Sequence, residues 1–319
     1  MTQSLVTSIE SLGHWLVKQN YSFITPTPAT HGRVYARHGS GKGTTLRDIF
    51  GWSLPFELES MDKKAVQFLR DADLLEIVGN HHRSRLRFSS VGERLYAHSA
   101  YPTTTSDAIF FGPDTYRFVN LIANELAFEP LGEHSQILDV CCGAGPGGIE
   151  AAFASPSKNV TVTFADINPQ AVEFSKANAR INTLDSACFT EGNLFDAVFG
   201  NFDLVVANPP YLVDQASRVY RSGGGQLGAA LSEKIVAQGI TRLAPGGRLI
   251  VYTGVAIVEG VDLFLQNVRA ILGDAALSFR YFELDPDVFG EELDTPAYSH
   301  VDRIAAVALV VKNIAVASP

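Results

Sequence analysis

The segment Asn208-Pro209-Pro210-Tyr211 combines groups that could bind a planar nitrogen atom. It follows the apolar run Phe202–Ala207, which predicts a buried strand. Two successive prolines end the hydrogen bonding of a strand, and the residue before a proline is held extended. The turn would therefore present the amide of Asn208, carbonyls that accept N–H bonds, and an aromatic ring for stacking. An ordinary strand-ending turn is the other interpretation.

A glycine-rich stretch after residues 137–140 has the spacing of a nucleotide-binding turn. Gly143, Gly145 and Gly148 match the G-x-G-x-x-G pattern, in which glycines let the backbone approach a ligand before a helix begins. Asp166 follows at the end of the next predicted strand, where a carboxylate can bind ribose hydroxyls. The stretch predicts a nucleotide-containing cofactor, and NAD is one candidate.

Two observations separate NAD from other cofactors. Asp139 lies four residues before Gly143, and a carboxylate there would repel a pyrophosphate but attract an ammonium or sulfonium group. The turn at Asn208 has no obvious role in hydride transfer. A carboxylate that caps the turn is the alternative interpretation of Asp139.

Together these segments resemble the class I S-adenosylmethionine-dependent methyltransferases. They resemble most closely the amino-methyltransferases with an Asn-Pro-Pro-Tyr motif, the HemK-type or methyltransferase small-domain group, which includes enzymes that methylate a release-factor glutamine, ribosomal RNA guanine or DNA adenine. The resemblance covers roughly residues 107–311. The segments that carry it are 139–148, Asp166, 192–196 and 208–211, with weaker similarity at 223–228 and 244–248.

The resemblance implies S-adenosyl-L-methionine as cofactor and S-adenosyl-L-homocysteine as product. It places the backbone of the glycine loop against the methionine part, Asp139 near the ammonium, and Asp166 on the ribose. Asn193 stands where the family often has an aspartate that binds adenine, and an amide oxygen can still accept that bond. The implied cofactor-binding residues are Asp139, Cys141, Gly143, Gly145, Asp166, Ile167, Asn193, Leu194 and Asn208.

The same resemblance makes Asn208, Pro209 and Tyr211 the predicted catalytic residues. Methyl transfer is an in-line displacement, so the enzyme must mainly align the reactants and exclude water. The Asn208 side-chain oxygen and the Pro209 carbonyl would accept N–H bonds from the acceptor, which directs the nitrogen lone pair at the methyl group. Tyr211 would stack on the acceptor, and no strong general base is needed.

Weaker candidates for substrate contact flank this core. Phe111 and Asp114 lie in a segment before it, where packing and helix capping are the alternatives, and Tyr298 and His300 precede the last predicted strand. Basic residues cluster in the N-terminal part, either to contact phosphates or as a solvated turn. That cluster consists of His81, His82, Arg83, Arg85 and Arg87.

Alternating strand and helix patterns after residue 106 predict an α/β fold. We expect a doubly wound, mostly parallel, seven-stranded Rossmann-like sheet that ends in an antiparallel hairpin at its edge. The expected strands are 136–140, 160–165, 187–190, 202–207, 248–253, 277–284 and 303–311, and the expected helices are 146–154, 169–180, 227–243 and 261–272.

Residues 1–105 predict a separate, small α+β domain that docks the substrate, with residues 106–319 as the catalytic domain. A helix at 62–70, then strands at 74–78 and 85–88 around a polar turn at 79–84, has the outline of a winged helix. Ser90 with Glu93 fits a capping box and predicts another short helix.

Composition narrows the protein class. The net charge is −9, but residues 1–115 carry only +1 and residues 116–319 carry −10, which argues against an extended polyanion-binding face. Three cysteines without metal-ligand spacing predict a reduced protein without a metal site. The sequence shows no signal-peptide or membrane-span pattern, and we expect a cytoplasmic protein.

Several questions stay open at this point. The acceptor could be a small molecule, a protein glutamine or RNA, and the protein a monomer or a homodimer. A methyltransferase for an oxygen or carboxylate of a metabolite is the main alternative function. A nicotinamide-dependent oxidoreductase and a binding module without catalysis are the alternatives from other classes.

Overall fold

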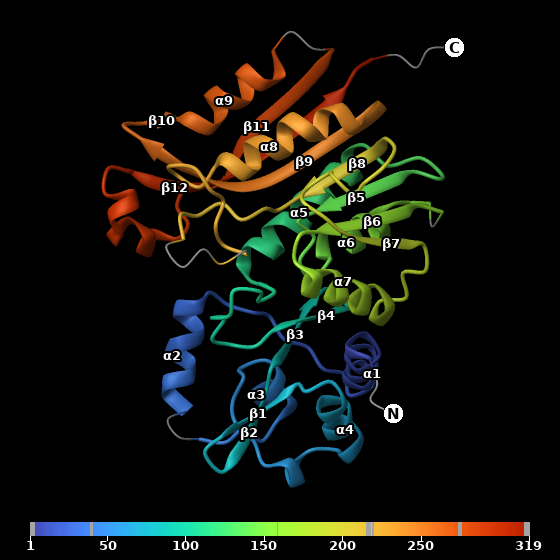
Figure 1. Cartoon of the computed structure of the whole chain (residues 1–319), viewed down its shortest axis with the longest axis vertical. Coiled ribbons are helices and arrows are strands. Elements are labelled where there is room, and N and C mark those ends of the chain that lie inside the picture. Colours follow the sequence, from blue (N-terminus) through green and yellow to red (C-terminus); the bar gives the residue numbers. More distant parts are fainter. Residues whose placement is uncertain are drawn as a thin grey trace. The chain divides into compact units, whose positions relative to one another are not determined.

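A computed structural model describes residues 4–38, 41–157, 159–214, 218, 220–273 and 276–315. The chain divides into two compact units (Figure 1). The N-terminal unit takes the described residues up to Tyr116 together with 143–146 and 169–185. The second unit takes the others, and we call it the catalytic unit because it contains the residues predicted to be catalytic. No helix among these described stretches is long and apolar enough to span a membrane. The functional boundary between residues 105 and 106 stays a prediction.

The N-terminal unit contains helices and two separate antiparallel strand pairs. Ser4 caps its first helix, and Asp62 caps the helix predicted at 62–70 by accepting hydrogen bonds from the next turn. The helices are α1 (Leu5–Lys18), α2 (Pro28–His38), α3 (Leu46–Phe50), α4 (Lys63–Asp71) and α7 (Pro169–Ile181), and the strands are β1 (Leu75–Val78), β2 (His81–Ser84), β3 (Leu86–Val91) and β4 (Arg94–Ser99).

The polar segment 79–84 is mostly strand, so its prediction as a turn was wrong. His81–Ser84 forms β2 and pairs with β1, which leaves only Gly79 and Asn80 in the turn. Gly79 has a φ of +60°, which glycine adopts without steric cost and which allows so tight a turn. Four polar residues can form a strand here because pairing with β1 satisfies their backbone groups.

The short helix predicted from Ser90 is also wrong. Ser90 and Val91 end β3, Gly92 turns the chain with a φ of +56°, and β4 begins at Arg94. The Ser90 backbone N–H donates to the carbonyl of Phe23 at 2.8 Å, and its hydroxyl accepts from the Phe23 N–H at 3.3 Å. These distant partners use the groups that a capping box would have used.

The catalytic unit is built on one sheet with the order β11-β12-β9-β8-β5-β6-β7, seven strands in the described part of the chain, and β10 beside β9. The strands β7, β6, β5, β8 and β9 are parallel, and β12 is antiparallel to both β9 and β11. This confirms the mostly parallel sheet with an antiparallel hairpin at its edge. The strands are β5 (Gln136–Val140), β6 (Thr161–Asp166), β7 (Ala187–Glu191), β8 (Phe202–Ala207), β9 (Leu243–Val258), β10 (Val261–Asp262), β11 (Leu277–Asp285) and β12 (Arg303–Asn313).

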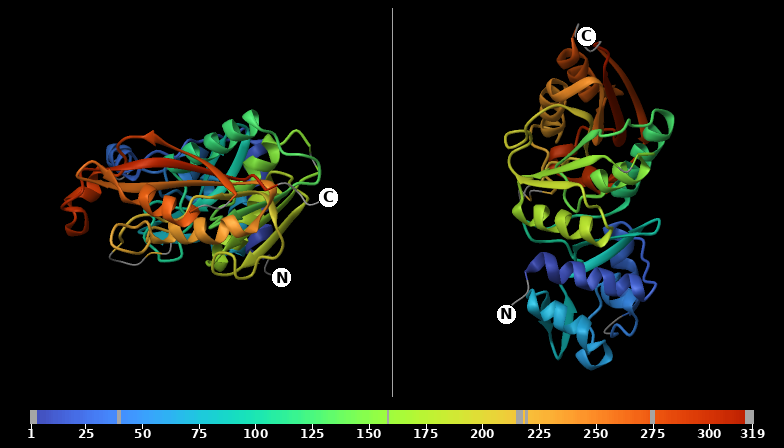
Figure 2. Two further views of the ribbon diagram at one scale, coloured as in Figure 1. Left: turned by 90° about the horizontal axis from the view of Figure 1, so that it is seen from above. Right: turned by 90° about the vertical axis from the view of Figure 1, so that its right-hand side faces the viewer.

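Helices cover both faces of this sheet (Figure 2). On one face, α8 (Ala230–Gly239) and α9 (Leu263–Leu272) pack into an apolar cluster with residues of β8, β9 and β12. On the other, α5 (Pro113–Phe128) receives hydrogen bonds from Arg248 of β9, and α6 (Pro146–Ala154) packs its Gly148 against Phe164 of β6. The sheet is therefore doubly wound, as predicted.

Two helix boundaries differ from the prediction. The helix expected over 227–243 is α8 followed by a 3-10 turn, and Leu243 already belongs to β9 because it pairs with Phe202 of β8. The helix expected from Val261 starts at Leu263, since Val261 and Asp262 pair with β9 and Asp262 then caps α9. Apolar periodicity cannot locate such caps.

Candidate active site

The parallel strands of the catalytic unit bring four predicted segments to one edge of the sheet. Asp139 lies in β5, Asp166 ends β6, Asn193 follows β7 and Asn208 follows β8. The carboxyl ends of neighbouring parallel strands lie side by side, and this edge is where open α/β sheets bind ligands. Residues far apart in the sequence thus share one edge.

Asp139 is buried and caps the helix after the glycine loop. Its side chain is 1% exposed, and its Oδ2 accepts from the Gly148 N–H at 2.8 Å. Burial raises the pKa of this carboxyl well above its ordinary value; the Gly148 hydrogen bond opposes the rise, and the negative charge of Asp166 adds to it. The geometry is that of the capping carboxylate, and contact with a cofactor ammonium stays a prediction.

Asp166 ends β6, and Ile167 follows it. The Asp166 Oδ1 accepts from the Asn168 N–H at 2.9 Å, and its backbone carbonyl accepts from Gly192 after β7. Ile167, directly beside it, is 55% exposed. An apolar side chain held open next to a half-buried carboxylate suits the adenine and ribose of a nucleoside.

The glycine loop continues from β5 with several residues in the left-handed region. Gly143 and Gly145 have φ values of +52° and +79°, and an added Cβ at Gly143 would meet nothing within 4 Å. Cys141 also has a positive φ, of +57°, although it is not a glycine. Burial raises the pKa of the Cys141 thiol well above its ordinary value, which disfavours a nucleophilic thiolate.

The two predicted cofactor-binding residues after β7, Asn193 and Leu194, differ in their exposure to solvent. Asn193 is exposed, so its amide can reach a ligand. Leu194 is buried in the apolar cluster under α8 and has a φ of +53°. Leu194 therefore shapes the turn with its backbone, while its side chain packs in the core.

The Asn208 turn is rigid and closely supported. Asn208 is half-buried and Pro209 buried. The Tyr211 ring is 7% exposed and lies directly against Gly254, where an added Cβ would come within 2.4 Å of ring carbons. Phe289 packs edge-on against the same ring with centroids 5.8 Å apart.

Two loops of the catalytic unit are joined at this turn. The Tyr298 hydroxyl accepts from the Val213 N–H at 2.9 Å, and Arg221 forms an ion pair with the buried Glu292. We call these four residues the acceptor-side clasp. Tyr298 therefore supports the loop after Asn208, whereas His300 is exposed. Glu292 and Phe289 were missed by the sequence analysis, because no local pattern distinguishes them from other loop residues.

The other weak candidates lie in the N-terminal unit. Phe111 is 1% exposed and stacks on the buried His98 with centroids 5.0 Å apart, and Tyr116 packs edge-on against it. Asp114 is buried in the first turn of α5. Packing, the alternative considered for Phe111, is the role that these contacts support.

Much of the positive charge in the basic cluster is compensated or buried. Arg83 forms an ion pair with Glu76, and His81 lies 4.0 Å from Glu57. Arg87 is 4% exposed and donates to the Ser99 carbonyl, and burial lowers its pKa to about 10. Arg85 is exposed, so the cluster as a whole offers less positive charge to phosphates than its five basic residues suggest.

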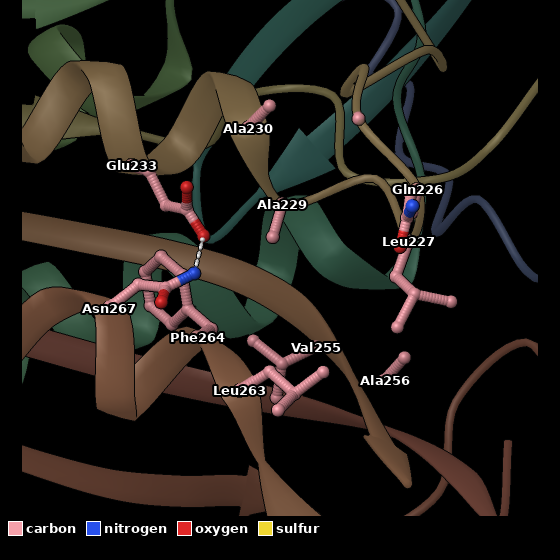
Figure 3. Close-up of a pocket in the computed structure, with 11 residues that line it drawn as sticks. Gln226, Leu227, Ala229, Ala230, Glu233, Val255, Ala256, Leu263, Phe264 and Asn267 are labelled. Carbon is pink, nitrogen blue, oxygen red and sulfur yellow. Dashed lines mark hydrogen bonds between the residues drawn. The ribbon is translucent and has the colours of Figure 1, made fainter.

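A pocket of about 260 Å³ lies beside α8 and α9, apart from the predicted site residues (Figure 3). Glu233 and Asn267 are joined there by a hydrogen bond of 2.7 Å, and most of the other walls are apolar. The segment Gly225 to Leu227 forms one wall, so the pocket adjoins the loop that follows the Asn208 turn.

Comparisons with known proteins relate part of the chain to methyltransferases. Residues 119–257 match the family described as Methyltransferase small domain. Ribosomal RNA small subunit methyltransferase C of Salmonella arizonae is 36% identical over 124 residues, covering 36% of this chain and 35% of that protein. Release factor glutamine methyltransferase of Deinococcus radiodurans is 28% identical over 203 residues, covering 60% and 66%. The alignments thus span about a third and about two thirds of these relatives.

Among solved structures, M. jannaschii TYW2 in complex with AdoMet is similar with a TM-score of 0.49 and 14% identity, covering 74% of this chain and 89% of that one. The match at residues 119–257 includes the glycine loop, Asp166 and the Asn208 turn. Residues 119–257 therefore carry a methyltransferase small domain, the domain of S-adenosylmethionine-dependent methyltransferases.

Proposed function

We propose that the protein transfers a methyl group from S-adenosylmethionine to a planar nitrogen. The observation that carries this proposal is the position of Asn208, a half-buried amide in a proline-locked turn at the carboxyl end of β8. The neighbouring strand β5 carries Asp139, and Asp166 lies one strand further, on β6. Such a turn holds its acceptor groups in place before the reaction, which lowers the cost of alignment.

The residues present fit the cofactor. Asp166 would bind the ribose hydroxyls, Ile167 would pack on adenine, and the amide of Asn193 would contact its amino group. The open backbone at Gly143 and Gly145 would lie against the methionine part. Asp139 would act on this loop through its bond to Gly148. When bound, the cofactor supplies an electrophilic methyl group on a sulfonium.

At the acceptor, Asn208 Oδ1 and the Pro209 carbonyl would each accept an N–H bond. These bonds orient the nitrogen lone pair and stabilise the positive charge that develops as the C–N bond forms and the C–S bond breaks. The extra proton then leaves the nitrogen to water. Tyr211 would contact the planar group at the edge of its largely buried ring.

We propose the side-chain amide of a protein glutamine as the first candidate acceptor. The ion-paired Arg83, the buried Arg87 and the −10 charge of residues 116–319 disfavour an RNA phosphate backbone. One of the relatives is named for release factor glutamine. Residues 1–105 would dock the acceptor protein. A ribosomal RNA guanine is the second candidate, because the other relative is named for ribosomal RNA.

The test is transfer of tritium from methyl-labelled S-adenosylmethionine to a purified unmethylated release factor and, separately, to unmethylated 30S subunits. We expect label in the release factor. Asn208→Ala should lower its rate by about a hundredfold or more, as for loss of a main transition-state contact, while the Kd for S-adenosylhomocysteine stays within about threefold.

Asn201→Ala is the matched control, because Asn201 is an exposed asparagine just before β8. It should behave as wild type. If label appears only in the 30S subunits, the acceptor is a nucleobase and the proposal of a glutamine amide is wrong. An Asn208→Ala variant that loses cofactor affinity and rate equally would disprove the acceptor role of Asn208.

A further inference from the structure

Asn178 in α7 is a buried side chain that no predicted motif includes. It is 0% exposed and makes three hydrogen bonds within the N-terminal unit. Its Oδ1 accepts from the Ala97 N–H at 2.7 Å, and its Nδ2 donates to the Ala97 carbonyl at 2.9 Å and to the Ala144 carbonyl at 2.8 Å. One amide therefore joins β4 to the centre of the glycine loop.

Asn182, one helical turn later, makes the same pair of bonds to β4 without reaching the loop. Its Oδ1 accepts from the Leu95 N–H at 3.1 Å, and its Nδ2 donates to the Leu95 carbonyl at 2.9 Å. Leu95 and Ala97 are two residues apart on β4, so both face α7 with their backbone groups. The two asparagine side chains form hydrogen bonds with the N–H and carbonyl groups on this edge of β4, as the backbone of a neighbouring strand would.

The bond to Ala144 holds the carbonyl of a peptide that lies between two glycines. Ala144 stands between Gly143 and Gly145, and both glycines have positive φ values. The Ala144–Gly145 peptide is trans, so its N–H points opposite to its carbonyl. Holding the Ala144 carbonyl thereby also directs the Gly145 N–H, immediately before Pro146 opens α6.

We propose that Asn178 is a positioning residue for S-adenosylmethionine and couples cofactor binding to β4. The inference rests on the proposed cofactor site at the glycine loop. Without Asn178, the buried Ala144 carbonyl loses this donor and the loop moves to find another, because an unsatisfied buried carbonyl is costly. Reciprocally, a cofactor that holds the loop also stabilises the β4 backbone through the same side chain.

The experiment compares Asn178→Ala with Asn182→Ala in the full chain. Both variants lose two bonds to β4, and only the first loses the bond to the loop. By calorimetry with S-adenosylhomocysteine, we expect Asn178→Ala to weaken binding about tenfold or more, corresponding to one hydrogen bond to a buried group. Asn182→Ala should stay within about twofold, although its thermal stability falls by a similar amount.

Hydrogen exchange gives a readout that does not depend on affinity alone. S-adenosylhomocysteine at saturation should slow exchange of the Ala97 amide in wild type and in Asn182→Ala, but not in Asn178→Ala. If Asn178→Ala does not fold, Asn178→Leu replaces it, because leucine fills the same volume and has no donor for the Ala144 carbonyl.

The outcomes separate the two proposals. A wild type that does not bind S-adenosylhomocysteine overturns the proposed function and this inference with it. Binding by wild type, with equal Kd values for the Asn178 and Asn182 variants, overturns the inference alone. If S-adenosylhomocysteine does not change the exchange rate of the Ala97 amide in wild type, the coupling to β4 is also overturned.

Discussion

The cofactor half and the acceptor half of the candidate site are held together in different ways. In the cofactor half, side chains cap backbone groups close in sequence: Asp139 binds Gly148, and Asp166 binds Asn168. In the acceptor half, the clasp joins residues 70 or more positions apart, such as Val213 to Tyr298. Because its caps are local, the cofactor half can be recognised in the sequence as a motif. The acceptor half depends on contacts that only the tertiary fold creates.

Glycines show the same contrast. At Gly143 in the cofactor half, an added Cβ meets nothing within 4 Å, so the glycine is needed for its φ and for an approaching ligand. At Gly228 in the acceptor half, an added Cβ would come within 2.1 Å of the Tyr211 carbonyl oxygen. Gly228 is needed because the loop packs backbone to backbone against the catalytic turn.

The largest expected effect comes from Gly228→Ala. We expect a loss of about 3 to 5 kcal/mol in the free energy of unfolding, from overpacking against backbone plus a φ of +83°. Gly143→Ala, the matched control, should cost about 1 to 2 kcal/mol for its positive φ alone. Denaturant unfolding measures both. Equal losses would remove the contrast between the two halves.

A smaller effect is expected at the clasp. Glu292→Gln removes the charge that pairs with Arg221. Asp214 remains 3.6 Å from the Arg221 guanidinium, so the positive charge of Arg221 keeps a carboxylate partner and the variant should fold. Methyl transfer should fall about tenfold, because breaking a buried pair displaces the loop that supports the turn. The Kd for S-adenosylhomocysteine should not change, and trypsin should cleave after Arg221 faster.

Glu283→Gln is the control for this variant. Glu283 pairs with Arg303 near the same loop, but both side chains are about a third exposed or more. An exposed pair contributes about 0 to 1 kcal/mol, so transfer and cleavage should match wild type. If Glu292→Gln behaves like this control, the clasp does not position the turn.

The smallest effect concerns Asp139 in the cofactor half. Its pKa is raised in the folded state, so its contribution to stability is full below the unfolded pKa of about 3.9 and is lost as pH rises through the folded pKa. The asparagine side chain of an Asp139→Asn variant can still cap Gly148 but carries no charge. The Tm of the variant should therefore match or exceed that of wild type at pH 8. The Tm difference in favour of the variant should be smaller at pH 4.

The same variant separates capping from contact with the cofactor. If Asp139 acts through Gly148 alone, the Kd for S-adenosylhomocysteine should change by less than about threefold, since the cap is kept. A loss of tenfold or more would place the Asp139 charge at the cofactor ammonium, and the cofactor half would then depend on charge as well as on caps.

Much of the fold was predictable because its signals are local. The strands at Gln136–Val140 and Phe202–Ala207 and the helix at Pro146–Ala154 were predicted to the residue, from apolar runs that end at glycine or proline. Predictions failed where backbone or side-chain groups form hydrogen bonds with residues distant in the sequence instead of with near neighbours. Ser90 bonds Phe23 instead of capping a helix, and His81–Ser84 pairs with β1 instead of forming a turn.

The sequence by itself determined the motifs of the family: a glycine loop, a carboxylate at the end of the second strand, and an Asn-Pro-Pro-Tyr turn. Each of these is recognised from residues that are close together in the sequence. Only the tertiary structure decided what surrounds them. Asn178 reaches Ala144 across 34 positions, and Glu292 reaches Arg221 across 71. Such contacts depend on how helices and loops pack, and neither composition nor spacing along the chain records that packing.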